Sequence, residues 1–341
     1  MSTLTDLLDD VRAQIEPDGD ALSEARARLA FVRECGANFY GALRTYRSGS
    51  LAVHTMNKPV TDGDGGLVLN RNFYPGLGPE GTGEEAPTEV VDALCAHLGP
   101  LIRDQYPNAK IYKSKRGPKI LFGAPLSDGT DPTVDLVLAL TRKDGAGIWI
   151  PNLSDDTWDA SDPEKHASLF NSGLAGFRST RRKITRLAKA WTKQYTNPGA
   201  SSFEMSVWAY EFVEPNMGMA KGLWALFDGA ATRLAAGDPT EDPAGVSDNL
   251  RLEIEASKMA VRLRKAAENF RRALDSDDDD EIRSAVSAVF WKYIESDDSA
   301  SLVAAVTKLG VPVAAAALGV PVAATTAGAS AARAYGASPG R

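Results

Sequence analysis

Three aspartates in the amino-terminal half of the chain have the residue types and spacing of a divalent-metal site. Asp62 and Asp64 are two residues apart at the start of a strand-like run, so on a strand both carboxylates point to the same face. Asp135 lies in an apolar run, where a buried carboxylate requires a partner such as a cation. Three carboxylates on neighbouring strands would hold the two metal ions of phosphoryl or nucleotidyl transfer. A surface acidic turn is the alternative for Asp62 and Asp64.

The sequence DGDGG that begins at Asp62 is also similar to the start of a calcium-binding loop of the EF-hand kind. Such a loop requires glycine at its sixth position and glutamate at its twelfth. Here the sixth position is Leu67 and the twelfth is Phe73, so this class of calcium site is excluded.

A Gly-Ser pair, Gly49 and Ser50, lies between a helix-like segment and a short apolar run that is typical of a strand. Glycine frees the backbone, a hydroxyl can reach a phosphate oxygen, and the amides of such a turn form an anion-binding concavity. Taken alone, the pair is more typical of an ordinary turn. Together with the three carboxylates, it predicts a site for a nucleoside triphosphate.

A basic helix is predicted from Arg178 to Tyr195, and it contains no acidic residue. Helical spacing separates an apolar face from a basic one. The apolar face contains Ile184, Leu187, Ala188, Trp191 and Tyr195, and the basic face contains Arg182, Arg186, Lys189 and Lys193. Such a face either lines a triphosphate cleft or is plain solvated surface.

The elements that would position these residues differ between the two halves of the chain. Periodicity predicts helices over residues 20–47 and 88–104 and strands over residues 119–122 and 134–138, which indicates a mixed α/β front half. From residue 163 onward the pattern is helical, and it includes a helix over residues 248–274. His97 and His166 have no partners at metal-ligand spacing and are interpreted as surface or packing residues.

Composition places the chain among soluble globular proteins, because 43% of its 341 residues are hydrophobic and 24% are charged. Its net charge of −7 argues against bulk attraction to nucleic acid, so no stable nucleic-acid partner is expected. The start of the chain is acidic where a secretory leader would be basic, and the two cysteines form no CxxC motif, so we expect a reducing cytoplasm. Residues 309–332 are uncharged, but Pro312 and Pro321 argue against a membrane span.

The ordered set of these motifs resembles the polymerase-β-like nucleotidyltransferases and, more narrowly, the cGAS/DncV-like nucleotidyltransferases (CD-NTases). The resemblance covers about residues 20–275. It rests on YRSGSLAVHT (46–55), DGD (62–64), VDL (134–136), IPN (150–152), SDPEKH (161–166), RLAKAW (186–191) and SSF (201–203). It implies an α+β fold, in which a nucleotidyltransferase core with a mixed sheet joins a helical carboxyl-terminal lobe across an active-site cleft. The expected boundaries are 1–160 for the core, 161–298 for the helical lobe and 299–341 for a low-complexity tail.

Catalytic and metal-binding roles follow from the resemblance. Asp62, Asp64 and Asp135 would hold two Mg²⁺ or Mn²⁺ ions, and Asp135 would help to deprotonate the attacking ribose hydroxyl. Gly49 and Ser50 would bind the donor triphosphate.

The resemblance also assigns nucleotide-binding residues in the helical half. Lys189 and Ser202 would reach the triphosphate, and Phe203 would stack on a nucleobase, although an aromatic residue at a helix start is otherwise a core residue. His54 stands where relatives have glycine, which predicts an altered loop geometry or base preference.

The function implied is an enzyme that condenses nucleoside triphosphates into a cyclic di- or trinucleotide and releases pyrophosphate. Such a product is a second messenger of antiphage (CBASS) defence that activates a separate effector. Accessory regulatory or conjugating proteins are expected in some relatives. The alternatives are a linear or transfer reaction on RNA, protein or a small-molecule hydroxyl, and a gated or vestigial nucleotide-binding sensor.

Overall fold

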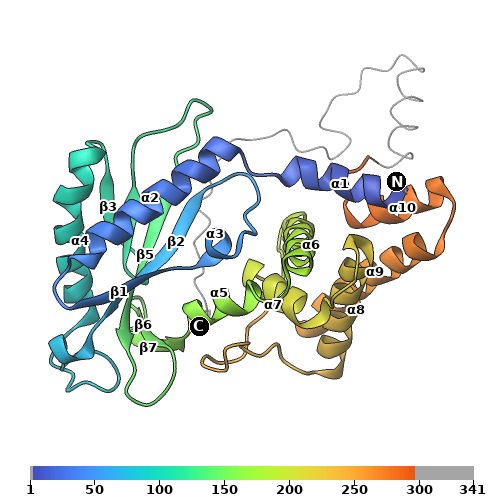
Figure 1. Cartoon of the computed structure of the whole chain (residues 1–341). Coiled ribbons are helices and arrows are strands. Elements are labelled where there is room, and N and C mark those ends of the chain that lie inside the picture. Colours follow the sequence, from blue (N-terminus) through green and yellow to red (C-terminus); the bar gives the residue numbers. More distant parts are fainter. Residues whose placement is uncertain (1–2, 296–341) are drawn as a thin grey trace.

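The computed structural model describes residues 3–295 and divides into a sheet-containing lobe and a lobe of helices (Figure 1). The predicted α+β class, with its helices concentrated in the carboxyl-terminal half, is confirmed. The predicted tail, residues 299–341, lies outside the described residues, as does the uncharged stretch at 309–332.

The sheet has seven strands and a mixed topology, and strands β2 and β5 form its parallel pair. Five strands run in the order β1-β2-β5-β4-β3, while β6 pairs with the end of β5 and with β7. The predicted strands at 119–122 and 134–138 correspond to β4 and β5. The strands are β1 (Ala42–Arg47), β2 (Asp62–Leu69), β3 (Lys110–Lys113), β4 (Pro118–Leu121), β5 (Thr133–Thr141), β6 (Ile148–Asn152) and β7 (Thr157–Ser161).

Helices α2 (Gly19–Ala37) and α4 (Pro87–Gln105) pack against the sheet and enclose its hydrophobic core. The prediction of a helix over 20–47 is wrong beyond residue 37. The helix ends at the cap Asn38, Gly41 adopts a positive φ of 71°, and β1 then pairs with β2. Helical spacing of the apolar residues therefore continues by coincidence through a turn and a strand.

A buried arginine fixes α2 to the segment that leads into β5. The Arg28 guanidinium donates to Ala124 O at 2.6 Å and Pro132 O at 2.7 Å, and it forms an ion pair with Asp131. It also lies 4.6 Å above the centre of the Phe122 ring. These contacts satisfy the buried charge and hold the amino-terminal end of β5 in place.

The helical lobe has its own hydrophobic core, to which the first helix of the chain contributes. Helix α9 begins eight residues later than the predicted start at 248, because the chain from 237 to 255 forms an irregular connection. Helix α5 (Pro163–Phe170) lies between the lobes. The lobe contains α1 (Thr3–Ile15), α6 (Ala175–Lys193), α7 (Ser202–Phe212), α8 (Met219–Ala236), α9 (Ala256–Asp275) and α10 (Asp279–Val289).

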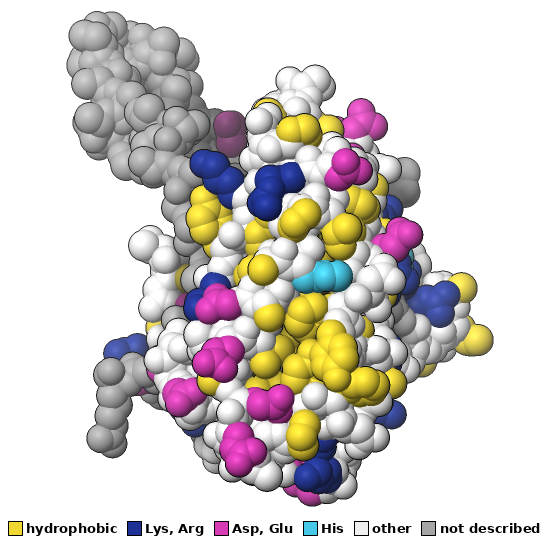
Figure 2. All heavy atoms as spheres, turned by 90° about the vertical axis from the view of Figure 1, so that its left-hand side faces the viewer, with side chains coloured by type: hydrophobic (Ala, Val, Ile, Leu, Met, Phe, Trp, Pro, Cys, Tyr) yellow, Lys and Arg dark blue, Asp and Glu magenta, His cyan; other side chains and the backbone are white. Residues whose placement is uncertain are grey.

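The outer side of the sheet lobe carries exposed apolar side chains. Figure 2 looks onto this side and shows hydrophobic side chains gathered in a band between charged ones. Tyr40 and Phe73 are 67% and 48% exposed and meet edge to face, with their ring centres 5.3 Å apart. Between residues 3 and 295, no helix has the length and apolarity needed to cross a membrane.

Candidate active site

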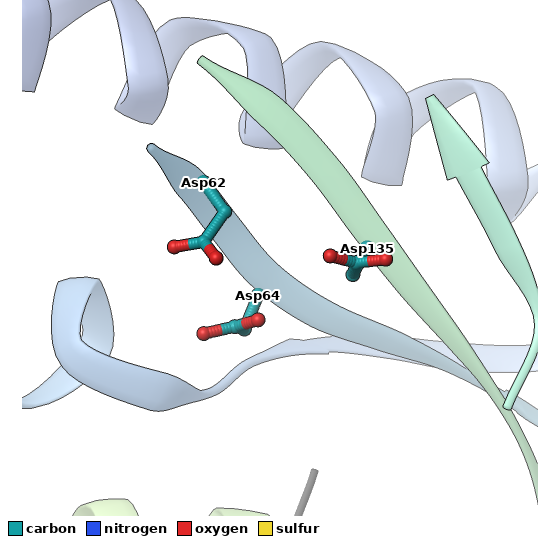
Figure 3. A group of neighbouring side chains, drawn as sticks. All are labelled: Asp62, Asp64 and Asp135. Carbon is teal, nitrogen blue, oxygen red and sulfur yellow. The ribbon is translucent and has the colours of Figure 1, made fainter. Parts of the chain in front are cut away.

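The three predicted aspartates form one cluster, here called the carboxylate triad (Figure 3). Asp62 and Asp64 lie on β2, and the parallel register pairs Asp64 with Asp135 on β5. One carboxylate oxygen from each residue lies within 4.8 Å of the others. Oxygen donors at this spacing suit a hard divalent cation.

The triad is electrostatically unfavourable without a cation. Burial and, after it, the neighbouring charges of Asp62 and Asp135 together raise the pKa of Asp64 to about 7. Burial and Asp135 likewise raise the pKa of Asp62, against the opposing effect of Lys119. A divalent cation would remove this penalty, because it favours the ionised form of each carboxylate.

Glycines on β2 allow neighbouring elements to approach the triad strand closely. A side chain at Gly63 would contact the α2 backbone and Leu29 at 3.3 Å, and one at Gly66 would overlap the Tyr46 ring. Glycine weakens a strand, but here it permits α2 and β1 to pack tightly against β2.

The Gly-Ser turn, residues 48–55, connects β1 to β2 and contains the short helix α3 (Gly49–Val53). The predicted setting, after a helix and before a strand, is wrong, because β1 precedes the pair and α3 follows it. Gly49 has φ +63°, and a side chain there would overlap the Asp64 carboxylate. Ser48 N–H also donates to Asp64 O at 3.0 Å, so the turn lies directly against the triad.

His54 ends α3 in the left-handed conformation, with φ 59° and ψ 40°. This region favours glycine, and a side chain there costs roughly 1 kcal/mol. His54 therefore retains the backbone conformation that a glycine would adopt, while it places an exposed imidazole beside the turn.

Lys189 of α6 reaches the Gly-Ser turn from the helical lobe. Its Nζ donates to Thr55 Oγ1 at 2.8 Å and to Ser50 Oγ at 3.3 Å, and the residue is only 5% exposed. Burial, together with nearby Lys193, lowers the pKa of Lys189 to about 7, and Asp64 opposes this shift. The structure thus brings Lys189, Ser50 and the triad together.

Two other residues of the basic face hold the fold together. Arg186 donates to Asn57 Oδ1 at 3.0 Å and to Ile15 O at 3.1 Å, which ties α6 to two segments of the amino-terminal half. Arg182 donates to Asn171 Oδ1 at 2.7 Å. On the basic face, Lys189 therefore contacts the Gly-Ser turn, whereas the hydrogen bonds of Arg182 and Arg186 stabilise the fold.

Ser202 and Phe203 lie at the start of α7, and Phe203 packs against a hydrophobic cluster that includes Val53 of the Gly-Ser turn. Ser202 is exposed, and no hydrogen bond links its hydroxyl to the Gly-Ser turn in the described part of the chain. Phe203 is partly buried and meets His166 and Phe170, with ring centres 4.9 and 5.7 Å away. Their nucleotide-binding roles stay predictions.

Sequence reasoning missed two polar interactions. Lys119 on β4 forms an ion pair with Asp135, with its Nζ 2.9 Å from Oδ2. His166, interpreted as a surface or packing residue, is buried and hydrogen-bonded to Asp242. For the second interaction the available signal was a carboxylate in the irregular connection from residue 237 to 255, but the partners of neither interaction are close in sequence.

Comparisons with known proteins support the fold. No protein-family model matches the sequence, and no curated protein does so. E. coli MS115-1 CdnC, solved with ATP, aligns over 86% of this chain and 98% of its own at 14% identity and a TM-score of 0.62. Bradyrhizobium diazoefficiens CD-NTase CdnG, solved with GTP, aligns over 84% of this chain and 95% of its own, at 14% identity and a TM-score of 0.61.

Vibrio cholerae DncV, a cyclic AMP-GMP synthase, aligns over 75% of this chain and 70% of its own at 15% identity and a TM-score of 0.51. These similarities extend across both lobes, and the identities are low. The chain therefore has the two-lobed nucleotidyltransferase fold of the CD-NTases.

Proposed function

We propose that this protein is a metal-dependent nucleotidyltransferase of the CD-NTase type. The observation that carries the proposal is the convergence of the triad, the Gly-Ser turn and Lys189 from elements far apart in sequence. A cluster of carboxylates can bind the metal ions of a triphosphate substrate. A hydroxyl-bearing turn and a lysine ammonium can bind the triphosphate itself.

The triad fits two Mg²⁺ or Mn²⁺ ions, because its three carboxylates provide hard oxygen ligands close together. When bound, the ions would neutralise the triphosphate, orient the attacking hydroxyl and stabilise the departing pyrophosphate.

The protein's own groups would bind the substrate and move one proton. Backbone amides of the Gly-Ser turn and Ser50 Oγ would hold the triphosphate, and Lys189 would place its ammonium against the same group. The negative triphosphate would restore the charge on Lys189 that burial disfavours. Asp135 would accept the proton of the attacking ribose hydroxyl.

The product we propose is a cyclic di- or trinucleotide, closed by successive attacks of a ribose hydroxyl on an α-phosphate. The structural similarity to DncV, a cyclic AMP-GMP synthase, supports this choice. The messenger would act in the cytoplasm on a separate antiphage effector. A CdnC structure with a HORMA protein supports an accessory regulator as a further partner.

The test is incubation of purified protein with Mn²⁺ or Mg²⁺ and the four nucleoside triphosphates, followed by phosphatase treatment and mass spectrometry. We expect a phosphatase-resistant nucleotide that the Asp62→Asn/Asp64→Asn variant does not form. Equal product from that variant, or none from the wild type, would contradict the proposal. A phosphatase-sensitive oligomer would indicate the linear reaction instead.

A further inference from the structure

Lys119 occupies a place in the site that the sheet register fixes. The parallel pairing sets Asp64 beside Asp135, and the antiparallel pairing of β4 with β5 sets Asp135 beside Lys119. The three residues therefore form one row across β2, β5 and β4. Lys119 Nζ lies 2.9 Å from Asp135 Oδ2, with side chains 32% and 15% exposed.

The row contains two acidic side chains, Asp64 and Asp135, and the positive charge of Lys119 offsets their repulsion. Like charges on directly opposed strand positions destabilise a sheet. Of the cations among residues 3–295, Lys119 is the one that forms an ion pair with a triad carboxylate. Lys189, a buried lysine nearby, donates instead to Ser50 and Thr55.

We propose that Lys119 is a resident counterion of the triad, a positioning residue that holds the Asp135 carboxylate before metal binds and competes with the metal for it. The inference rests on the proposed metal site. A divalent ion that uses Asp135 Oδ2 must replace the Lys119 hydrogen bond. An ion at either oxygen of this carboxylate must also bind near a fixed positive charge. Lys119 would therefore stabilise the metal-free protein and weaken metal binding at the same time.

These two effects have opposite signs, and that separates the proposal from a simpler structural role. If Lys119 only supported the strand, its loss would lower stability and leave metal affinity the same or weaker. As a resident counterion, its loss must lower the stability of the metal-free protein while metal affinity rises.

The experiment is a titration of the full chain with Mn²⁺, with free Mn²⁺ measured by electron paramagnetic resonance. Thermal unfolding is recorded with and without the ion. We expect Lys119→Met to lower the Kd for Mn²⁺ at least about threefold, the scale of a partly exposed ion pair. Its metal-free Tm should fall, and Mn²⁺ should restore it. Lys119→Arg should keep the wild-type Kd.

Lys113→Met is the matched control, because Lys113 lies on the adjacent strand β3 and pairs with exposed Asp92. It makes the same charge change and should leave the Kd unchanged. Lys119→Gln, which removes the charge but keeps a hydrogen-bond donor, replaces the Met variant if that variant fails to fold. An unchanged or higher Kd for Mn²⁺ in folded Lys119 variants overturns the inference about Lys119 but not the proposed metal site. Absence of Mn²⁺ binding by the wild type overturns both.

Discussion

The carboxylate triad, which is partly buried, and the His166–Asp242 pair, which is buried, differ in how their carboxylates are stabilised. Asp242 accepts hydrogen bonds from His166 and from the N–H groups of Ala244, Val246 and Ser247. Although burial opposes it, these bonds lower the pKa of Asp242. In the triad, burial and like charges raise the pKa of Asp64.

The difference distinguishes a carboxylate with a structural role from carboxylates that form a ligand site. A carboxylate whose lone pairs accept hydrogen bonds from the protein holds segments together, and Asp242 fixes the irregular connection of residues 237–255 to α5. Carboxylates that face one another are maintained at a cost to stability, which is typical of a site completed by a ligand. The comparison predicts that substitutions in the two clusters affect stability in opposite directions.

The largest stability effect should come from Asp242→Ala. The substitution leaves three backbone N–H groups and a buried imidazole without their acceptor, so we expect a loss of about 3 kcal/mol in the free energy of unfolding. Denaturant titration measures this loss. Asp248→Ala, in the same connection but exposed, is the control and should change stability little. Activity per folded molecule should be retained, and a selective loss of activity would place Asp242 in the site.

Lys189→Met keeps the length of the side chain and removes its charge. We expect it to have a smaller effect in free energy, on substrate binding and not on stability. Losing the ammonium at the Gly-Ser turn should raise the KM for triphosphates about 10- to 100-fold, the scale of a charge-assisted contact. Stability should not fall, since burial disfavours the charge. Lys183→Met on the same helix is the control for steady-state kinetics. An unchanged KM would remove Lys189 from the substrate site.

The smallest effect should be a gain of stability in metal-free Asp64→Asn. Because the pKa of Asp64 is raised to about 7, the folded wild type binds this proton more tightly than the unfolded chain. Its stability contribution is therefore present at low pH and is lost as pH rises toward 7. The variant should become more stable than the wild type at pH 8, with a smaller difference at pH 5. A loss of stability at pH 8 would contradict this account of the triad.

Strand alternation and apolar runs were enough to predict much of this site. Asp62, Asp64 and Asp135 come together because residues two apart share a face of a strand and an apolar run marks a buried strand. Helical spacing placed Lys189 on a basic face with three other residues, and only the resemblance to the CD-NTases singled it out. The Gly-Ser pair was found, but its setting was wrong, because apolar residues after Gly36 kept helical spacing through a turn into β1.

Interactions that depend on register or tertiary contact were beyond sequence reasoning. Lys119 meets Asp135 only through the pairing of β4 with β5, and nothing near Lys119 in the sequence marks that partner. His166 and Asp242 are 76 residues apart, and their contact depends on the folding of an irregular connection. Arg182 and Arg186 had the pattern of a substrate face, yet their hydrogen bonds are structural.

The most direct test of the central claim is the stoichiometry of pyrophosphate released against triphosphate consumed, in the presence of Mn²⁺. Nucleotidyl transfer with ring closure releases one pyrophosphate for every triphosphate used, and we predict that ratio together with its loss in Asp62→Asn/Asp64→Asn. Release of orthophosphate in place of pyrophosphate, or an unchanged ratio in the variant, would contradict the assignment of the triad to nucleotidyl transfer.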